Sequence, residues 1–145
     1  MLTKSKSVLN TKNKSITLIP ALIWAGIIAF ISLVPGDELP QTNFHINDKL
    51  VHFLIYFSFT GVLFASLYPY LRLSSNNNPL RDSLIISSLI SFAYGTMIEF
   101  LQEYMNMGRS ADLYDVLANL SGIIIAVFTI LIFKVNRLLV KVLGI

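Results

Sequence analysis

The chain has 145 residues, of which 54% are hydrophobic and only 13% are charged, about half the charged fraction of an average globular domain. With a mean hydropathy of +0.68, this composition excludes an ordinary soluble domain and is typical of a one-domain integral membrane protein. The absence of cysteine excludes disulfides, thiolate nucleophiles and cysteine-ligated metals. The net charge of +3 comes with no basic face on a soluble fold, so we expect no nucleic-acid partner.

The first apolar stretch follows a basic segment, residues 1–15, which carries four lysines. It runs from Ile16 to Val34, which is longer than the apolar part of a usual signal peptide, and it precedes no small-residue cleavage site. We therefore predict that residues 16–34 form a membrane span that is retained.

Three more apolar runs follow, separated by polar loops with proline, glycine or asparagine. They predict spans over about residues 50–71, 84–104 and 113–133. The expected fold is all-α, a polytopic membrane protein with a bundle of four transmembrane helices in one domain, residues 16–133. A basic tail follows over residues 134–145.

Lysine and arginine residues are divided unequally between the two sides of this predicted bundle. One side, which carries both termini and residues 72–83, holds nine of them, whereas the other side holds only Lys49 and Arg109. The positive-inside rule places the nine in the cytoplasm, so we expect both termini there. The opposite end of the bundle would then lie on the extracytoplasmic side of the cell membrane.

Glu99 and Asn119 stand well inside predicted spans, toward that extracytoplasmic end. Glu99 is 15 residues into the third span, roughly 22 Å along a hydrocarbon core about 30 Å thick. Asn119 is six residues into the fourth span, roughly 9 Å below the same surface. Because an ionisable residue at membrane depth is energetically costly, Glu99 is a candidate functional residue by default.

Polar residues also recur at helical spacing, so that each set lies on one helix face. The sets are Asp48, His52 and Tyr56; Glu99, Gln102 and Glu103; and Asp112, Asp115, Asn119 and Gly122. If these faces point inward, they line one polar pocket that opens outward. Small residues at Gly122 and Ala126, and at Gly61 and Ala65, would let the helices pack closely.

Each polar residue also has a structural interpretation. Glu99 could pair with Arg109 as a strut between helices, and His52 could simply reach toward the water interface. Asp112 could be a helix-start residue that faces the positive end of the helix dipole.

No established catalytic template accounts for these residues, since the chain has no HExxH motif, nucleophile elbow or glycine-rich phosphate loop. Glu99 and His52 are the candidate acid–base residues, and Arg109 suits a phosphate or carboxylate group. One histidine with several carboxylates could also ligate a divalent metal, although we expect the site to use no metal and no cofactor.

Three segments together resemble the VanZ-like family. They are Asp48-Lys49-x2-His52, Glu99-x2-Gln102, and Arg109-x2-Asp112-x2-Asp115-x3-Asn119-x2-Gly122. They stand in the family's order, and the resemblance covers roughly residues 20–135. It implies a small four-helix bacterial membrane protein with a role in the cell envelope.

The namesake of that family accompanies glycopeptide-resistance genes and raises resistance to teicoplanin, with little effect on vancomycin. Carried over by position, the residues expected to bind a ligand are Asp48, Lys49, His52, Glu99, Gln102, Arg109, Asp112, Asp115 and Asn119.

Three functions therefore remain open. The first is a protein that contributes to teicoplanin-type resistance by holding a lipid-linked, peptide-like or glycopeptide ligand at the outer leaflet. The second is a membrane enzyme that acts on a lipid head group or a lipid-linked wall precursor. The third is a structural or accessory membrane subunit. The expected partners are membrane lipids and such a ligand, and the sequence leaves the oligomeric state open.

Overall fold

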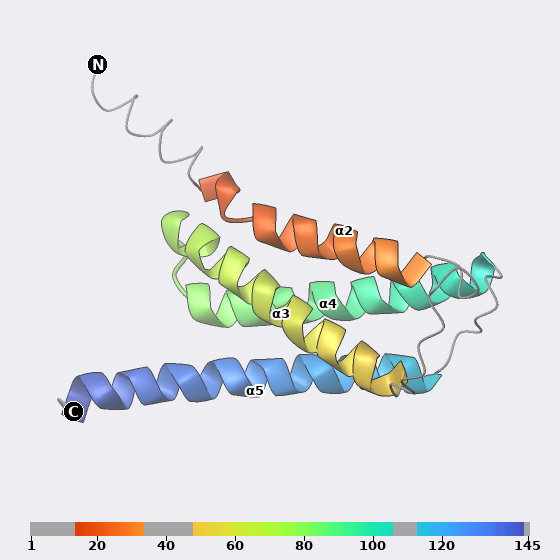
Figure 1. Cartoon of the computed structure of the whole chain (residues 1–145). Coiled ribbons are helices and arrows are strands. Elements are labelled where there is room, and N and C mark those ends of the chain that lie inside the picture. Colours follow the sequence, from red (N-terminus) through yellow and green to blue (C-terminus); the bar gives the residue numbers. More distant parts are fainter. Residues whose placement is uncertain (1–13, 34–47, 106–112, 144–145) are drawn as a thin grey trace, which may run out of the picture.

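A computed structural model describes residues 14–33, 48–105 and 113–143 of the chain. These residues form the long helices α2 (Ile19–Leu33), α3 (Asp48–Leu73), α4 (Pro79–Tyr104) and α5 (Leu113–Leu143). Figure 1 shows α3 crossing the bundle obliquely, with α2 and α5 on opposite sides of the α3 and α4 pair. Helix α3 packs against all three of the others and is the centre of the bundle.

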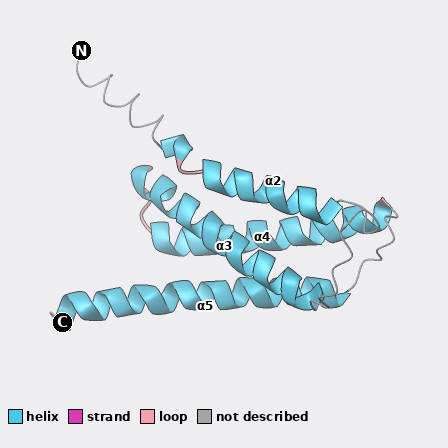
Figure 2. Ribbon diagram, in the orientation of Figure 1, coloured by secondary structure: helices cyan, strands magenta, loops and turns pink. Residues whose placement is uncertain are grey.

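The prediction of four membrane spans is confirmed, because each of these helices, with α2 counted from Lys14, is long and apolar enough to cross a bilayer. Figure 2 shows that the described residues are almost entirely helical. Helix α4 starts at Pro79, five residues before the predicted start of the span. A proline fits there because the first helical position has no N–H bond to lose. Helix α5 continues beyond the predicted span into the basic tail.

The apolar core is small, as expected for helices that are surrounded by lipid rather than water. It consists of Ala21, Ile28, Tyr56, Phe59, Leu63 and Ile123. Many of the large apolar side chains outside this core are exposed on the outer faces of the helices.

Helix α4 faces α3 with a seam of small residues, spaced four apart, that are Ser83, Ser87, Ser91 and Gly95. The three serines have no exposed surface, and Thr60 Oγ1 of α3 donates a hydrogen bond to Ser91 Oγ at 3.0 Å. The hydroxyls of Ser83 and Ser87 donate to main-chain carbonyls of their own helix. The seam therefore lets two helices approach closely without leaving those hydroxyls unpaired.

Helices α3 and α5 approach each other closely at Gly122. A Cβ atom there would lie 2.3 Å from Phe53 O and 2.9 Å from Phe57 N, both main-chain atoms of α3. The close packing predicted at Gly122 is thus confirmed. The same expectation for Gly61 is wrong, because a Cβ atom at Gly61 would meet no atom of the described residues within 4 Å.

Two side chains of α4 attach the edge helix α2. Tyr94 Oη donates to Ala25 O at 2.7 Å, and Gln102 Nε2 donates to Ser32 O at 2.7 Å. Ser32 lies in the last turn of α2, where carbonyl groups lack partners within the helix. Gln102 therefore supplies a hydrogen bond that the helix end needs.

Candidate functional site

Polar side chains from three helices meet at one end of the bundle, where α3 starts, α4 ends and α5 starts. We call this group the polar cluster, and it consists of Asp48, Lys49, His52, Glu99, Asp115 and Asn119. The helical spacing of these residues predicted one inward face on each helix, and the structure brings the three faces together. Glu99, Asp115 and Asn119 are 4%, 6% and 2% exposed, so charged and amide groups are held between the helices.

His52 lies at the centre of the polar cluster, and its two ring nitrogens face different partners. Nδ1 lies 3.2 Å from Asn119 Oδ1 and 3.4 Å from Glu99 Oε1, both on the buried side. Nε2 lies 3.9 Å from one oxygen of Asp48, which is exposed, and 3.9 Å from one oxygen of Asp115. The imidazole therefore stands between a carboxyl group inside the bundle and two carboxylates nearer its end.

A second contact within the polar cluster is the ion pair between Lys49 Nζ of α3 and Asp115 Oδ1 of α5. The Lys49 side chain is 37% exposed and that of Asp115 only 8%, so the lysine brings a positive charge from the helix end toward a buried carboxylate. Such a pair offsets part of the cost of removing the Asp115 carboxylate from water.

Three buried polar atoms at the inner side of the cluster have no hydrogen-bond partner among the described residues. They are Glu99 Oε1, Asn119 Nδ2 and Tyr56 Oη. Gly95 lies beside them, because a Cβ atom there would be 3.0 Å from Tyr56 Cζ and 3.2 Å from Asn119 Nδ2. Glu99 Oε1 still has its 3.4 Å contact with His52 Nδ1. Since an unpaired buried polar group costs about 1–3 kcal/mol, the other two atoms call for an explanation beyond packing.

The polar cluster also contains a possible set of metal ligands. One ligand atom each from Asp48, His52 and Asp115 lie within 4.8 Å of one another. Oxygen and imidazole donors of this kind suit a hard or borderline divalent cation. Lys49 already contacts the Asp115 carboxylate, so a cation would have to displace its ammonium group.

Six of the nine residues predicted to bind a ligand lie in the polar cluster. Gln102 is buried but donates its amide hydrogen to α2, and Glu103, on the same predicted face, is exposed. Arg109 and Asp112 lie outside the described residues. The contact between Glu99 and Arg109 therefore stays a prediction. Ligand binding by any of these residues stays a prediction.

Sequence reasoning missed two contributors to the site. Tyr56 was placed on the His52 face by its spacing, yet its hydroxyl was not among the predicted site atoms. Gly95 was missed altogether, although it continues the four-residue spacing of Ser87 and Ser91 toward Glu99. This regular spacing of small residues is the signal that could have identified Gly95 as the position on α4 against which the Tyr56 ring packs.

Comparison with known protein families gives a match. The model of the family described as VanZ/LLP1 matches residues 2–134, which is nearly the whole chain. Neither the curated proteins nor the solved structures with which the chain was compared include a significant match.

Proposed function

Because the chain belongs to the VanZ/LLP1 family and forms four membrane-spanning helices, we propose that it serves the bacterial cell envelope by binding a ligand at the polar cluster. In this proposal the ligand is recognised at the extracytoplasmic face, and binding contributes to resistance against teicoplanin-type glycopeptides. The family's namesake provides the resistance role, and the polar cluster provides the site.

The distribution of basic residues supports this orientation. Nine of the eleven lysines and arginines fall on the side that carries both termini, which the positive-inside rule assigns to the cytoplasm. Lys14, Arg72, Arg81 and Lys134 stand at the helix ends opposite the polar cluster. The polar cluster would then face the wall side of the membrane.

One observation carries the proposal, namely a histidine and a carboxyl group buried together beside unpartnered polar atoms. A purely structural polar network is expected to satisfy its members, because each unpaired atom lowers stability. Asn119 Nδ2 and Tyr56 Oη instead have no hydrogen-bond partner among the described residues, and Glu99 Oε1 has only its 3.4 Å contact with His52 Nδ1. A ligand that supplies hydrogen bonds to these atoms, or to the His52 ring next to them, would offset this loss of stability.

The second candidate is an enzyme that acts on a lipid head group, and the position of His52 favours it. An imidazole with one nitrogen toward the buried Glu99 and the other toward Asp48 and Asp115 can exchange a proton between the two sides. That arrangement suits general acid–base catalysis at the membrane surface.

The decisive experiment is drug sensitivity in a Gram-positive host that carries an empty vector, the wild-type chain or a variant. We expect wild type to protect against teicoplanin and hardly against vancomycin, and Glu99→Gln to abolish the protection at equal membrane levels. Glu103→Gln is the matched control, because Glu103 is an exposed glutamate one turn further along α4. It should protect like wild type.

Two outcomes would contradict the proposal. Well-expressed wild type that gives no protection would remove the resistance role from this chain. Equal loss of protection in Glu99→Gln and Glu103→Gln would show that the polar cluster is not the determinant. If Glu99→Gln also lowered the thermal stability as much as Glu99→Ala, the structural role of the cluster would be favoured instead.

A further inference from the structure

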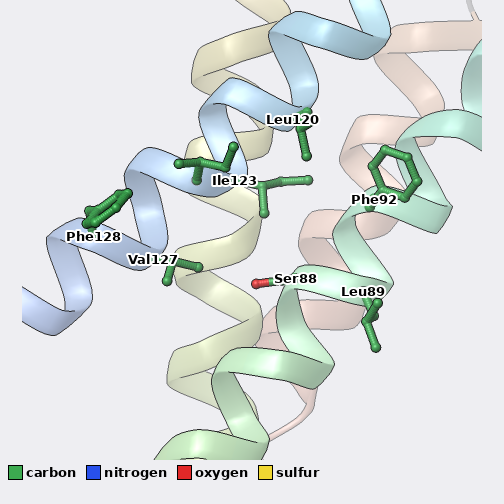
Figure 3. Close-up of a pocket in the computed structure, with 8 residues that line it drawn as sticks. Ser88, Leu89, Phe92, Leu120, Ile123, Val127 and Phe128 are labelled. Carbon is green, nitrogen blue, oxygen red and sulfur yellow. The ribbon is translucent and has the colours of Figure 1, made fainter.

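An apolar groove runs between α4 and α5 below the polar cluster (Figure 3). It has a volume of about 320 Å³ and is lined by Ser88, Leu89 and Phe92 of α4 and by Leu120, Ile123, Ile124, Val127 and Phe128 of α5. The one polar side chain, Ser88, donates its hydroxyl to Leu84 O of its own helix. The groove therefore presents hydrocarbon to whatever occupies it.

The groove follows from the way the helices cross. Helices α4 and α5 both pack against α3, which lies behind them in the close-up view. The side chains of Phe92 and Leu120 face the gap from opposite sides at its upper end, and Val127 and Ser88 lie further down, on α5 and α4 (Figure 3). The groove is thus open toward the surrounding lipid and closed at the back by the rest of the bundle.

Helical rise places the groove next to the polar cluster, on the side toward the centre of the bilayer. Leu120 follows Asn119, so the groove begins at about the level of the cluster on α5. On α4, Phe92 lies roughly 10 Å and Ser88 roughly 16 Å deeper than Glu99. Since Glu99 is near one end of the span, the groove reaches the middle of the hydrocarbon core.

We propose that this groove holds one hydrocarbon chain of a long-chain membrane lipid whose head group lies at the polar cluster. The inference rests on the proposed function and names the class of ligand that the polar cluster binds. The apolar lining excludes a polar occupant, and the bilayer supplies hydrocarbon chains at this depth. A volume near the lower end of the range for ligand pockets fits a single chain rather than a bulky ring system.

The head group can be specified by charge. The cluster combines the Lys49 ammonium with the carboxylates of Asp48, Glu99 and Asp115. A head group with both a phosphate and an amine would match this mixture, the phosphate at Lys49 and the amine at Asp48, whose side chain is 64% exposed. Phosphatidylethanolamine is therefore the probe of choice.

The test is native mass spectrometry of the purified full-length protein, stripped of lipid in detergent and titrated with dipalmitoyl phosphatidylethanolamine. Ser88→Phe fills the groove with an aromatic ring. Ser121→Phe is the matched control, because Ser121 is an exposed α5 serine that does not line the groove. We expect wild type and Ser121→Phe to retain one lipid, and Ser88→Phe to bind at least about tenfold more weakly.

Chain length gives a second measurement on the same protein. Dioctanoyl phosphatidylethanolamine carries the same head group on chains too short to fill the groove, so wild type should bind it at least about tenfold more weakly. Leu120→Trp, which obstructs the upper end of the groove, repeats the test if Ser88→Phe loses its helical circular dichroism.

Equal binding of the two lipids, or equal binding by both phenylalanine variants, would overturn the inference. So would a wild-type dimer that Ser88→Phe converts to a monomer without loss of lipid, since the groove would then be a subunit interface. Drug sensitivity is measured separately. Lipid retention without teicoplanin protection would support the groove and refute the proposed function, whereas protection without retention would refute the groove alone.

Discussion

The two ends of the bundle use charged side chains in opposite ways. At the polar end, Lys49 pairs with the buried Asp115, and His52 lies 3.4 Å from the buried Glu99. At the opposite end, charges stay at the surface, where Lys14 lies 4.6 Å from the centre of the Tyr70 ring, Lys134 lies 4.2 Å from that of Tyr68, and Arg81 pairs with Asp82.

The two ends differ in how much solvation their charged groups lose. Tyr68 and Tyr70 are half-buried at a helix end, where a cation above an aromatic ring contributes about 0.5–1 kcal/mol. Such a contact suits the membrane interface and requires no ligand. A carboxyl group held between helices loses its water and must be compensated by partners. The polar end is therefore where function is expected, and the opposite end is where the helices are positioned in the bilayer.

The largest loss of stability is expected from a change that separates α5 from α3. Gly122→Ala places a methyl group against the main chain of α3, which cannot move as a side chain can. We expect a loss of about 3 kcal/mol or more of stability, measured by thermal unfolding in detergent. Gly61→Ala is the control and should be nearly neutral, because no atom in the described part of the chain lies within 4 Å of its added Cβ atom. Equal melting temperatures for the two variants would refute the close helix contact.

Removing Lys49 tests how much the polar end depends on its buried ion pair. Lys49→Met leaves the 8% exposed Asp115 carboxylate without the ammonium group and should lower stability by about 2 kcal/mol. The value lies below that of a fully buried pair because the Lys49 side chain is partly exposed. Adding Asp115→Asn should recover most of the loss, and a double variant no more stable than Lys49→Met would contradict this account of the pair.

A third change distinguishes structural polar groups from functional ones at the same end. Gln102→Leu removes the hydrogen bond to Ser32 O and should lower stability by about 1 kcal/mol. Teicoplanin protection should be retained at equal membrane levels, which is the reverse of the pattern expected for Glu99→Gln. A Gln102→Leu variant that keeps full stability and loses protection would place Gln102 in the binding site after all.

The smallest effect is expected at the opposite end. Lys134→Gln removes the cation above the Tyr68 ring and should lower stability by about 0.5 kcal/mol, without any change in drug sensitivity. Thermal unfolding and the drug assay check the two parts. A loss as large as that of Lys49→Met would mean that the two ends do not differ as described.

The spans, and the helix face and depth of each polar residue, could be predicted because they depend on patterns within one helix. Run length gives the spans, and spacing at i, i+4 places Asp48 and His52 on one face. Depth from helical rise then brings Glu99 and Asn119 to a common level. These inferences need no knowledge of which helices are neighbours.

The remaining features depend on how helices are arranged around one another. Gln102 shares a helix face with Glu99, yet its amide bonds to α2, which no spacing within α4 could reveal. The wrong expectation for Gly61 has the same cause, because a small residue promotes close packing only where a neighbouring helix passes. The groove at Phe92 arises from the crossing of α3 and has no counterpart in a linear pattern.

The attachment of α2 has a consequence for how this chain can vary over evolutionary time. Tyr94 and Gln102 donate to the main-chain carbonyls of Ala25 and Ser32, and not to their side chains. Every amino acid supplies that carbonyl, so substitutions at these two α2 positions leave both hydrogen bonds in place. These two α2 positions can therefore accept other apolar residues, whereas a replacement of Tyr94 or Gln102 on α4 by an apolar residue removes the donor.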